Sequence, residues 1–183
     1  MISLRLLCAI GFGCLAVPSH AEVISDAFVL YKKVCVASDG DLAKSELLAL
    51  ENGLSMRSHG HNRKTFDRAS STPFTVPFVV LSPADPDRNK PMNLCVVSGE
   101  TAHMSEFDSF VQSQSLVEVE KEVGAASKFY LHGFATSEEC LASDYKLANC
   151  RLVMVIGKPR VNEEFSGEFR LYVTAPNHLA GPQ

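Results

Sequence analysis

The sequence predicts an α+β domain, with a mostly antiparallel sheet of about five strands and N-terminal helices packed on one face of it. Three observations lead to this class. Helical patterns come first along the chain, strand patterns dominate its last third, and the strands are joined by hairpin-like connections rather than by helices. The chain of 183 residues is long enough for a single such domain, over residues 22–183, and shows no internal sequence repeat.

Two helices are expected at the start of this domain. Ser25 can cap a helix that runs to about Ala37, because apolar residues recur in it at steps of three and four. A second helix fits residues 42–51, with Asp41 as its N-cap and Gly53 as its stop. Each helix would turn an apolar side toward the sheet.

The middle of the chain is predicted to hold a long loop, a hairpin and a short helix. Residues 55–73 lack periodicity and are expected to form the loop. Residues 75–98 have the pattern of a hairpin, with a turn-rich connection at 83–91. Ser105 can cap a short helix that ends near Gln112.

Strand patterns dominate the remainder of the chain. Residues 116–120 alternate apolar and acidic side chains, which fits an exposed strand but leaves its identity open. Residues 129–134 are expected to form a strand, and residues 151–157 a buried strand. Residues 159–166 would then be a hairpin loop that leads into a last strand over 167–174.

Residues 1–21 have the pattern of a secretory signal peptide. Arg5 precedes an apolar run over residues 6–17, Pro18 ends the run, and small residues lead to cleavage after Ala21. The alternatives are an uncleaved membrane anchor and a lipid-anchored protein. The apolar run is short for a membrane span, which argues against the uncleaved anchor. No later segment is long enough to cross a bilayer. We therefore expect a periplasmic or secreted protein without a transmembrane span.

The cysteines agree with export. The chain has six cysteines, of which four remain after cleavage: Cys35, Cys95, Cys140 and Cys150. Four cysteines allow three pairings, and an oxidising compartment favours two disulfides. We favour the pairs Cys35–Cys95 and Cys140–Cys150, with four buried free thiols as the alternative. No C-x-x-C motif occurs, so neither thioredoxin-like redox chemistry nor a common zinc knuckle is supported.

Charge and motifs limit the function classes. The net charge is −4 and charged residues make up 21% of the chain, whereas a general nucleic-acid binder would carry a basic excess. The sequence contains no phosphate-cradling glycine loop and no nucleophile elbow, G-x-S-x-G. We therefore expect neither a nucleic-acid partner nor a cofactor.

The predicted loop at 55–73 forms a local basic patch on this acidic chain. Its basic and aromatic residues are Arg57, Arg63, Lys64, Phe66 and Arg68. A single acid, Asp67, opposes them. Such a patch can contact an envelope protein or an anionic envelope component, with phenylalanine adding apolar contact. The alternative is a solvated loop without a partner.

The same loop holds a histidine pair, His59-Gly60-His61. Two imidazoles at this spacing can share a metal ion if the backbone is extended. A third ligand would have to come from elsewhere, such as His103, His132 or an acidic residue. The alternative is an exposed polar loop that binds no metal.

One set of features resembles a known group of proteins. These features are Phe28, the Val34-Cys35 pair, the polar step Ser38–Asp41, Gly53 and the later strand Leu94–Val97. Together they are similar to small signal-peptide-bearing exported proteins of unassigned function from Gram-negative bacteria. The resemblance implies export and a Cys35–Cys95 disulfide, and it supplies no activity.

From these observations we expect a small exported binding protein that is not an enzyme. It would present residues 55–73, or the hairpin tip at 83–91, to a protein or another component of the envelope. Two alternatives stay open. One is a small hydrolase or metal-dependent enzyme that uses His59 and His61, and the other is a structural envelope protein.

Overall fold

The computed structural model describes most of the predicted domain. The residues described are 24–60, 62–69, 77–85, 90, 92–124, 129–143, 147, 150–159 and 165–174. The predicted signal peptide and its cleavage point lie outside these residues. Within them, no helix is both long enough and apolar enough to cross a bilayer.

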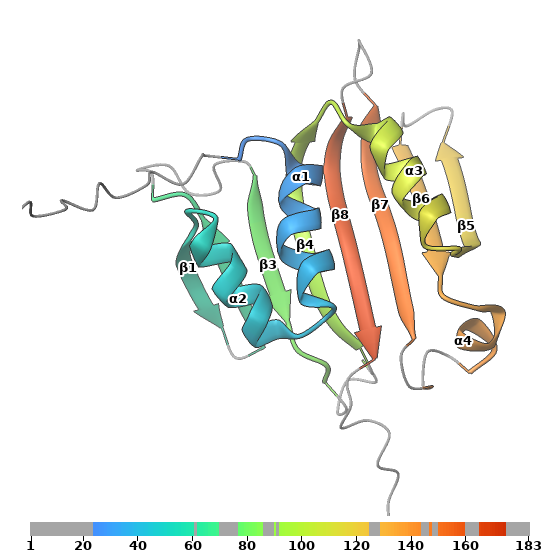
Figure 1. Ribbon diagram of the computed structural model, residues 1–183, viewed down its shortest axis with the longest axis horizontal. Helices are drawn as coiled ribbons and strands as arrows, with labels where there is room; N and C mark the ends of the chain where they lie inside the picture. Colours follow the sequence, from blue (N-terminus) through green and yellow to red (C-terminus); the bar gives the residue numbers. More distant parts are fainter. Residues whose placement is uncertain are drawn as a thin grey trace, which may run out of the picture.

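The described residues form one antiparallel sheet of eight strands (Figure 1). The spatial order is β1-β2-β3-β4-β8-β7-β6-β5, so β1 and β5 are the two edges. The strands are β1 (Ser55–Gly60), β2 (Arg63–Asp67), β3 (Phe78–Ser82), β4 (Met92–Thr101), β5 (Val117–Gly124), β6 (Phe129–Ala135), β7 (Arg151–Pro159) and β8 (Phe165–Thr174).

The fold class expected from the sequence is therefore wrong in its sheet, which has eight strands instead of about five. The long loop expected at 55–73 contains β1 and β2, paired as a hairpin. In β1 every residue after Ser55 is exposed, so no buried face imposes an apolar alternation. In β2 two of the three buried residues, Thr65 and Asp67, are polar, which conceals the strand pattern.

A layer of helices covers one face of the sheet (Figure 1). It consists of α1 (Ala27–Tyr31), which continues as the π-helical turn η1 (Lys32–Val36), then α2 (Leu42–Glu51) and α3 (Met104–Ser113). A short helix, α4 (Glu138–Ala142), lies in the connection from β6 to β7. The core fills the space between helices and sheet, and four fully buried rings meet in it: Phe28, Tyr31, Phe107 and Phe169.

The helix caps differ in part from those expected. Asp26, rather than Ser25, caps α1, because its carboxylate accepts hydrogen bonds from the amides of Phe28 (2.9 Å) and Val29 (3.0 Å). Asp41 caps α2 as predicted and accepts from the amide of Lys44 at 3.0 Å. At α3 the N-cap is His103 rather than Ser105.

The two halves of the sheet have the same topology although their sequences show no repeat. In each half a helix, α2 or α3, is followed by a four-stranded antiparallel meander. The last strands of the two meanders, β4 and β8, pair along ten residues in the middle of the sheet. Both edge pairs contain a register shift, at Met56/Ser58 and at Glu118/Glu120, a feature that increases the local twist of a strand.

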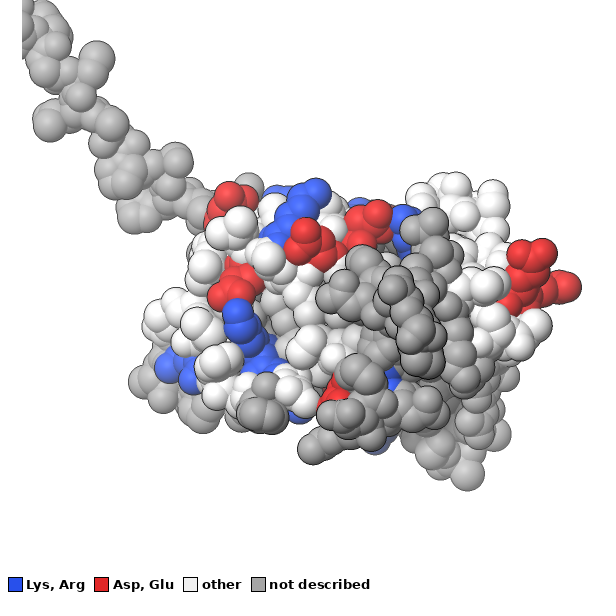
Figure 2. All heavy atoms as spheres, turned by 90° about the horizontal axis from the view of Figure 1, so that it is seen from below, with Lys and Arg blue, Asp and Glu red and all other residues white. Residues whose placement is uncertain are grey.

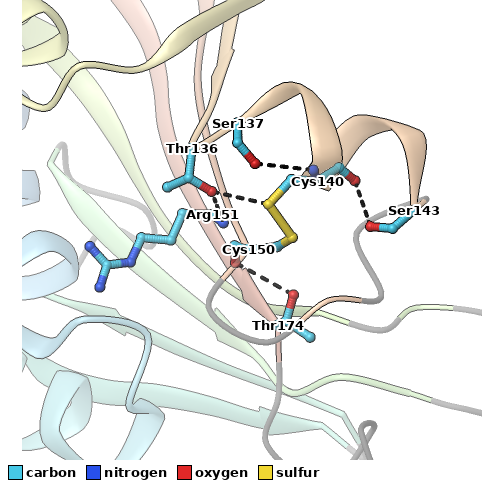
Figure 3. Close-up of a disulfide and its surroundings, with 7 residues drawn as sticks. All are labelled: Thr136, Ser137, Cys140, Ser143, Cys150, Arg151 and Thr174. Carbon is cyan, nitrogen blue, oxygen red and sulfur yellow. Dashed lines mark hydrogen bonds between the residues drawn. A yellow bond between two sulfur atoms is a disulfide. The ribbon is translucent and has the colours of Figure 1, made fainter.

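The structure contains two disulfides among the described residues, in the pairing favoured from the sequence. Cys35–Cys95 ties η1 to β4, and Cys140–Cys150 ties α4 to the residue before β7. Around the second disulfide, Ser137 Oγ accepts from the amide of Cys140 at 3.2 Å (Figure 3). The carbonyl of Cys150 accepts from the amide of Thr174 at 3.0 Å, which attaches this corner to the end of β8.

The turn between η1 and α2 needs a glycine at position 40. Gly40 has φ +78°, and a β-carbon there would overlap the side chain of Val173 on β8. We predict that Gly40→Ala lowers the free energy of unfolding by about 2–4 kcal/mol, because a left-handed backbone and an overpacked contact are both imposed. Urea unfolding measures this loss.

Gly53 provides the control. It has φ +79°, but nothing lies within 4 Å of where its β-carbon would be. Gly53→Ala should therefore cost about 1 kcal/mol, the backbone contribution alone. Equal losses at the two positions would contradict a close contact between the Gly40 turn and Val173.

Candidate binding site

The face of the sheet opposite the helices presents three rows of side chains. Residues such as Val79, Cys95 and Phe169 point into the core, so their neighbours along each strand point to the other face. Across β3, β4, β8 and β7 the rows are Ser82–Leu94–Tyr172–Leu152, Val80–Val96–Arg170–Met154 and Phe78–Ser98–Glu168–Ile156. We call this surface the open face.

A hollow of about 560 Å³ lies on the open face. Its apolar part consists of Phe78, Val80, Leu94 and Val96. Its polar part comes from strands β2, β3, β4 and β8 and from the β1–β2 and β3–β4 connections: Asn62, Arg63, Ser82, Asp85, Lys90, Ser98, Glu168 and Arg170. The hollow therefore joins the two segments that the sequence singled out, the 55–73 stretch and the hairpin tip at 83–91.

The charged groups in the hollow are held in different ways. Arg170 donates from Nε to Glu168 Oε2 at 2.8 Å, and from Nη1 to the hydroxyl of Tyr172 at 3.4 Å. Burial acts to lower the pKa of Arg170, but these hydrogen bonds outweigh it and raise the pKa, so the guanidinium stays charged. Asn62 donates to Asp85 Oδ2 at 2.8 Å, which links the two connections.

Three polar groups in the hollow have no such partners. Among the described residues, neither Arg63 nor Lys90 forms an ion pair. The hydroxyl of Ser98 is buried and has no hydrogen-bond partner. A ligand with acidic groups would compensate the two cations, and the apolar part of the hollow would bury its carbon atoms.

The basic residues predicted at 55–73 are mostly bonded within the protein. Arg57 pairs with the buried carboxylate of Asp67, and Lys64 pairs with Glu46 of α2 at 2.5 Å. Arg68 donates to the carbonyl of Ile24, and no carboxylate among the described residues pairs with it. Arg63 is exposed.

Phe66 was expected to add apolar contact to a partner. It is fully buried in the core between α2 and the sheet, so it lies away from the protein surface. The structure therefore replaces the predicted basic loop by a hairpin in which Arg63 near the turn is exposed and Arg68 at the end is half-buried.

Charge is distributed unevenly along the sheet. In the view of Figure 2, basic side chains lie toward the end of the molecule that carries β1 and β2, with acidic ones among them. The opposite end shows acidic side chains in this view. The hollow on the open face lies next to the more basic end, because Asn62 and Arg63 belong to the β1–β2 connection.

The histidine pair is described only in part. His59 is exposed on β1, and His61 lies outside the described residues. In the described part of the chain no three His, Cys, Asp or Glu side chains gather as metal ligands. The two histidines considered as third ligands lie on other elements, His103 before α3 and His132 on β6. The metal site at His59 and His61 remains a prediction.

A second polar hollow, of about 410 Å³, lies between α3 and the β5–β6 edge. His132 Nε2 and Glu118 Oε2 are 2.7 Å apart there, and Asp108 also lines the space. This pair has the geometry of a general base with an orienting carboxylate. No serine, threonine or cysteine is among the described residues that line it.

A charged cluster joins the start of α1 to the start of α3. His103 Nδ1 is 2.7 Å from Glu106 Oε1, and Lys32 Nζ is 2.8 Å from Glu106 Oε2. Asp26 lies beside them and is occupied by the cap of α1 and by Thr101. The sequence did not single out this cluster. Its contacts hold two helices against β4, which is a structural role.

Comparisons with other proteins assign no family and no function to the chain. No protein-family model, no curated protein and no solved structure matches the chain. The function is therefore argued from the open face and its surroundings.

The charged cluster makes a measurable prediction about Glu106. The hydrogen bond from Lys32, assisted by the charges of Lys32 and His103, lowers the pKa of Glu106 from its ordinary value of 4.5. Because the folded pKa is the lower one, the stabilisation is complete above pH 4.5 and is lost as the pH falls through the folded pKa. We predict that Lys32→Met moves this pKa back toward 4.5, as measured by NMR titration of the carboxyl carbon.

Lys33→Met is the matched control, since Lys33 is the next residue along the chain and is exposed. It should leave the titration of Glu106 unchanged. An identical titration in wild type and Lys32→Met would contradict the ion pair.

Proposed function

We propose that the chain is an exported, non-enzymatic binding module that takes a protein partner on its open face. The observation that supports this most directly is the hollow of about 560 Å³, in which an apolar surface is bordered by Arg63 and Lys90. Binding sites commonly combine an apolar surface with a few polar groups that fix the orientation of the ligand. The four cysteines in disulfides are compatible with an oxidising, exported location.

The partner we propose is an acidic segment of an envelope protein. Arg63 and Lys90 have no carboxylate partner among the described residues, so a bound acidic group would find two compensating charges. Phe78 and Leu94, which are half-buried, offer apolar contact beside those charges. Such charge complementarity mainly sets partner choice and association rate, while apolar burial supplies affinity.

A double variant tests this function. Lys90→Glu with Leu94→Ser reverses one bordering charge and removes one apolar contact of the hollow. Tagged protein is crosslinked in its host cells, and the proteins joined to it are quantified by mass spectrometry. We expect at least one acidic envelope protein to be recovered with wild type and reduced about tenfold with the variant, a loss of about 1.4 kcal/mol in binding.

The matched control is Lys33→Glu with Leu147→Ser. It makes the same chemical changes at exposed residues that do not line the hollow. Thermal unfolding of all three proteins verifies that they fold. Recovery that is equal for wild type and both variants would rule out the open face as the binding surface.

A further inference from the structure

The edge strand β1 and the neighbouring helix α2 expose a cluster of large hydrophobic side chains. The large hydrophobic side chains that are most exposed in the described part of the chain are Leu47 (61%), Met56 (49%), Leu50 (45%) and Leu147 (44%). The first three belong to α2 and β1, which lie side by side at one end of the molecule (Figure 1). Single exposed leucines are ordinary, whereas a cluster of them marks an interaction surface.

A groove between α2 and β1 adjoins these exposed hydrophobic side chains. A space of about 260 Å³ separates Leu42, Ala43 and Glu46 of α2 from His59 and Gly60 of β1, and Leu81 of β3 also lines it. On this side of the hairpin, Met56 pairs with the core residue Phe66, and His59 pairs with Lys64. Both Met56 and His59 therefore face α2 across the groove.

Among the described residues, β1 pairs only with β2. On either side of the register shift at Met56/Ser58, backbone amide and carbonyl groups of β1 therefore point away from β2. A helix beside an open edge strand is the arrangement that accepts an extended peptide: its backbone extends the sheet, and its alternate side chains enter the groove.

Charge indicates what kind of peptide fits. Residues 55–68 contain Arg57, Arg63, Lys64 and Arg68 against Asp67, a net charge of +3 in a chain of net charge −4. The pairs with Asp67 and Glu46 neutralise two of these cations, and among the described residues no carboxylate pairs with Arg63 or Arg68. Two β1 strands that met would bring like charges together, so an acidic strand is favoured over a second β1 strand.

We propose that the groove between α2 and β1 binds an extended segment of a partner protein, with alternating apolar and acidic residues, which adds to the sheet as a strand beside β1. The apolar residues contact Leu47, Leu50 and Met56, and the acidic ones face Arg63 and Arg68. The groove shares Asn62, Arg63 and Pro83 with the hollow on the open face, whereas Leu47, Leu50 and Met56 do not line that hollow. The proposal therefore goes beyond the proposed function, and changes at Leu47 and Leu50 test it without altering the lining of the open face.

The test uses the full, oxidised domain and a synthetic peptide of seven residues, acetyl-Val-Glu-Val-Glu-Val-Glu-Val-amide. With ¹⁵N-labelled protein, we expect peptide addition to shift the amide resonances of Ser55–Gly60 and to leave those of Leu94 and Val96 unchanged. The same peptide with every backbone nitrogen methylated cannot pair as a strand and should not bind. Replacing its glutamates by lysine should also abolish binding.

Two variants assign the apolar contacts. Leu47→Ser with Leu50→Ser should weaken peptide binding about tenfold, because both side chains lose contact area. Leu147→Ser removes a leucine of nearly the same exposure, 44% against 45% for Leu50, and should leave the affinity unchanged.

Three results would overturn the proposal. One is an absence of resonance shifts at millimolar peptide, and another is equal binding of the methylated peptide. The third is a concentration-dependent dimer, seen by sedimentation without peptide, whose formation shifts the same β1 amides. That result would assign the edge to a second copy.

Discussion

The arrangement of this protein depends on the attachment of the first helix to strand β4 at both ends. At the start of α1, the carboxylate of Asp26 accepts hydrogen bonds from Thr101 Oγ1 (2.8 Å) and from the amide of Ala102 (3.2 Å). One helix length later, Cys35 is covalently bound to Cys95, 60 residues along the chain. A crosslink of that span stabilises a fold by about 4 kcal/mol, mainly by restricting the unfolded chain. The helix therefore lies antiparallel to β4 in the middle of the sheet.

This attachment explains why the two faces of the sheet differ. With the first helix fixed over β4 and β8, α2 and α3 cover the two flanking meanders on the same side. The other face keeps its apolar rows without a helix layer, and the second disulfide, with Met92, Leu152 and Tyr172, packs at one end of it. The hollow at Val80 and Val96 lies on the rest of this face, where the two halves of the sheet meet.

The sequence predicted those parts of the fold in which local chemistry decides the structure. The cap at Asp41, the helix after it and the strand from Arg151 follow from local patterns, and the observed cysteine pairs are those favoured beforehand. The sequence did not predict β1 and β2, because an exposed edge strand shows no alternation of apolar and polar residues. The open face was also hidden, since Val80 and Val96 have the same apolar pattern as residues under a helix layer. Only their place in the assembled sheet shows that they lie on the face opposite the described helices α1, α2 and α3.

Crosslinking from single positions in living cells tests most directly whether the partner binds on the open face. A photoreactive benzoylphenylalanine replaces Leu94 in the hollow or, in a second strain, Ser109, which is exposed on α3 in the helix layer. The account predicts that irradiation joins a specific protein to the chain at position 94 and none at position 109. Crosslinks from position 109 alone, or from neither position, would contradict it.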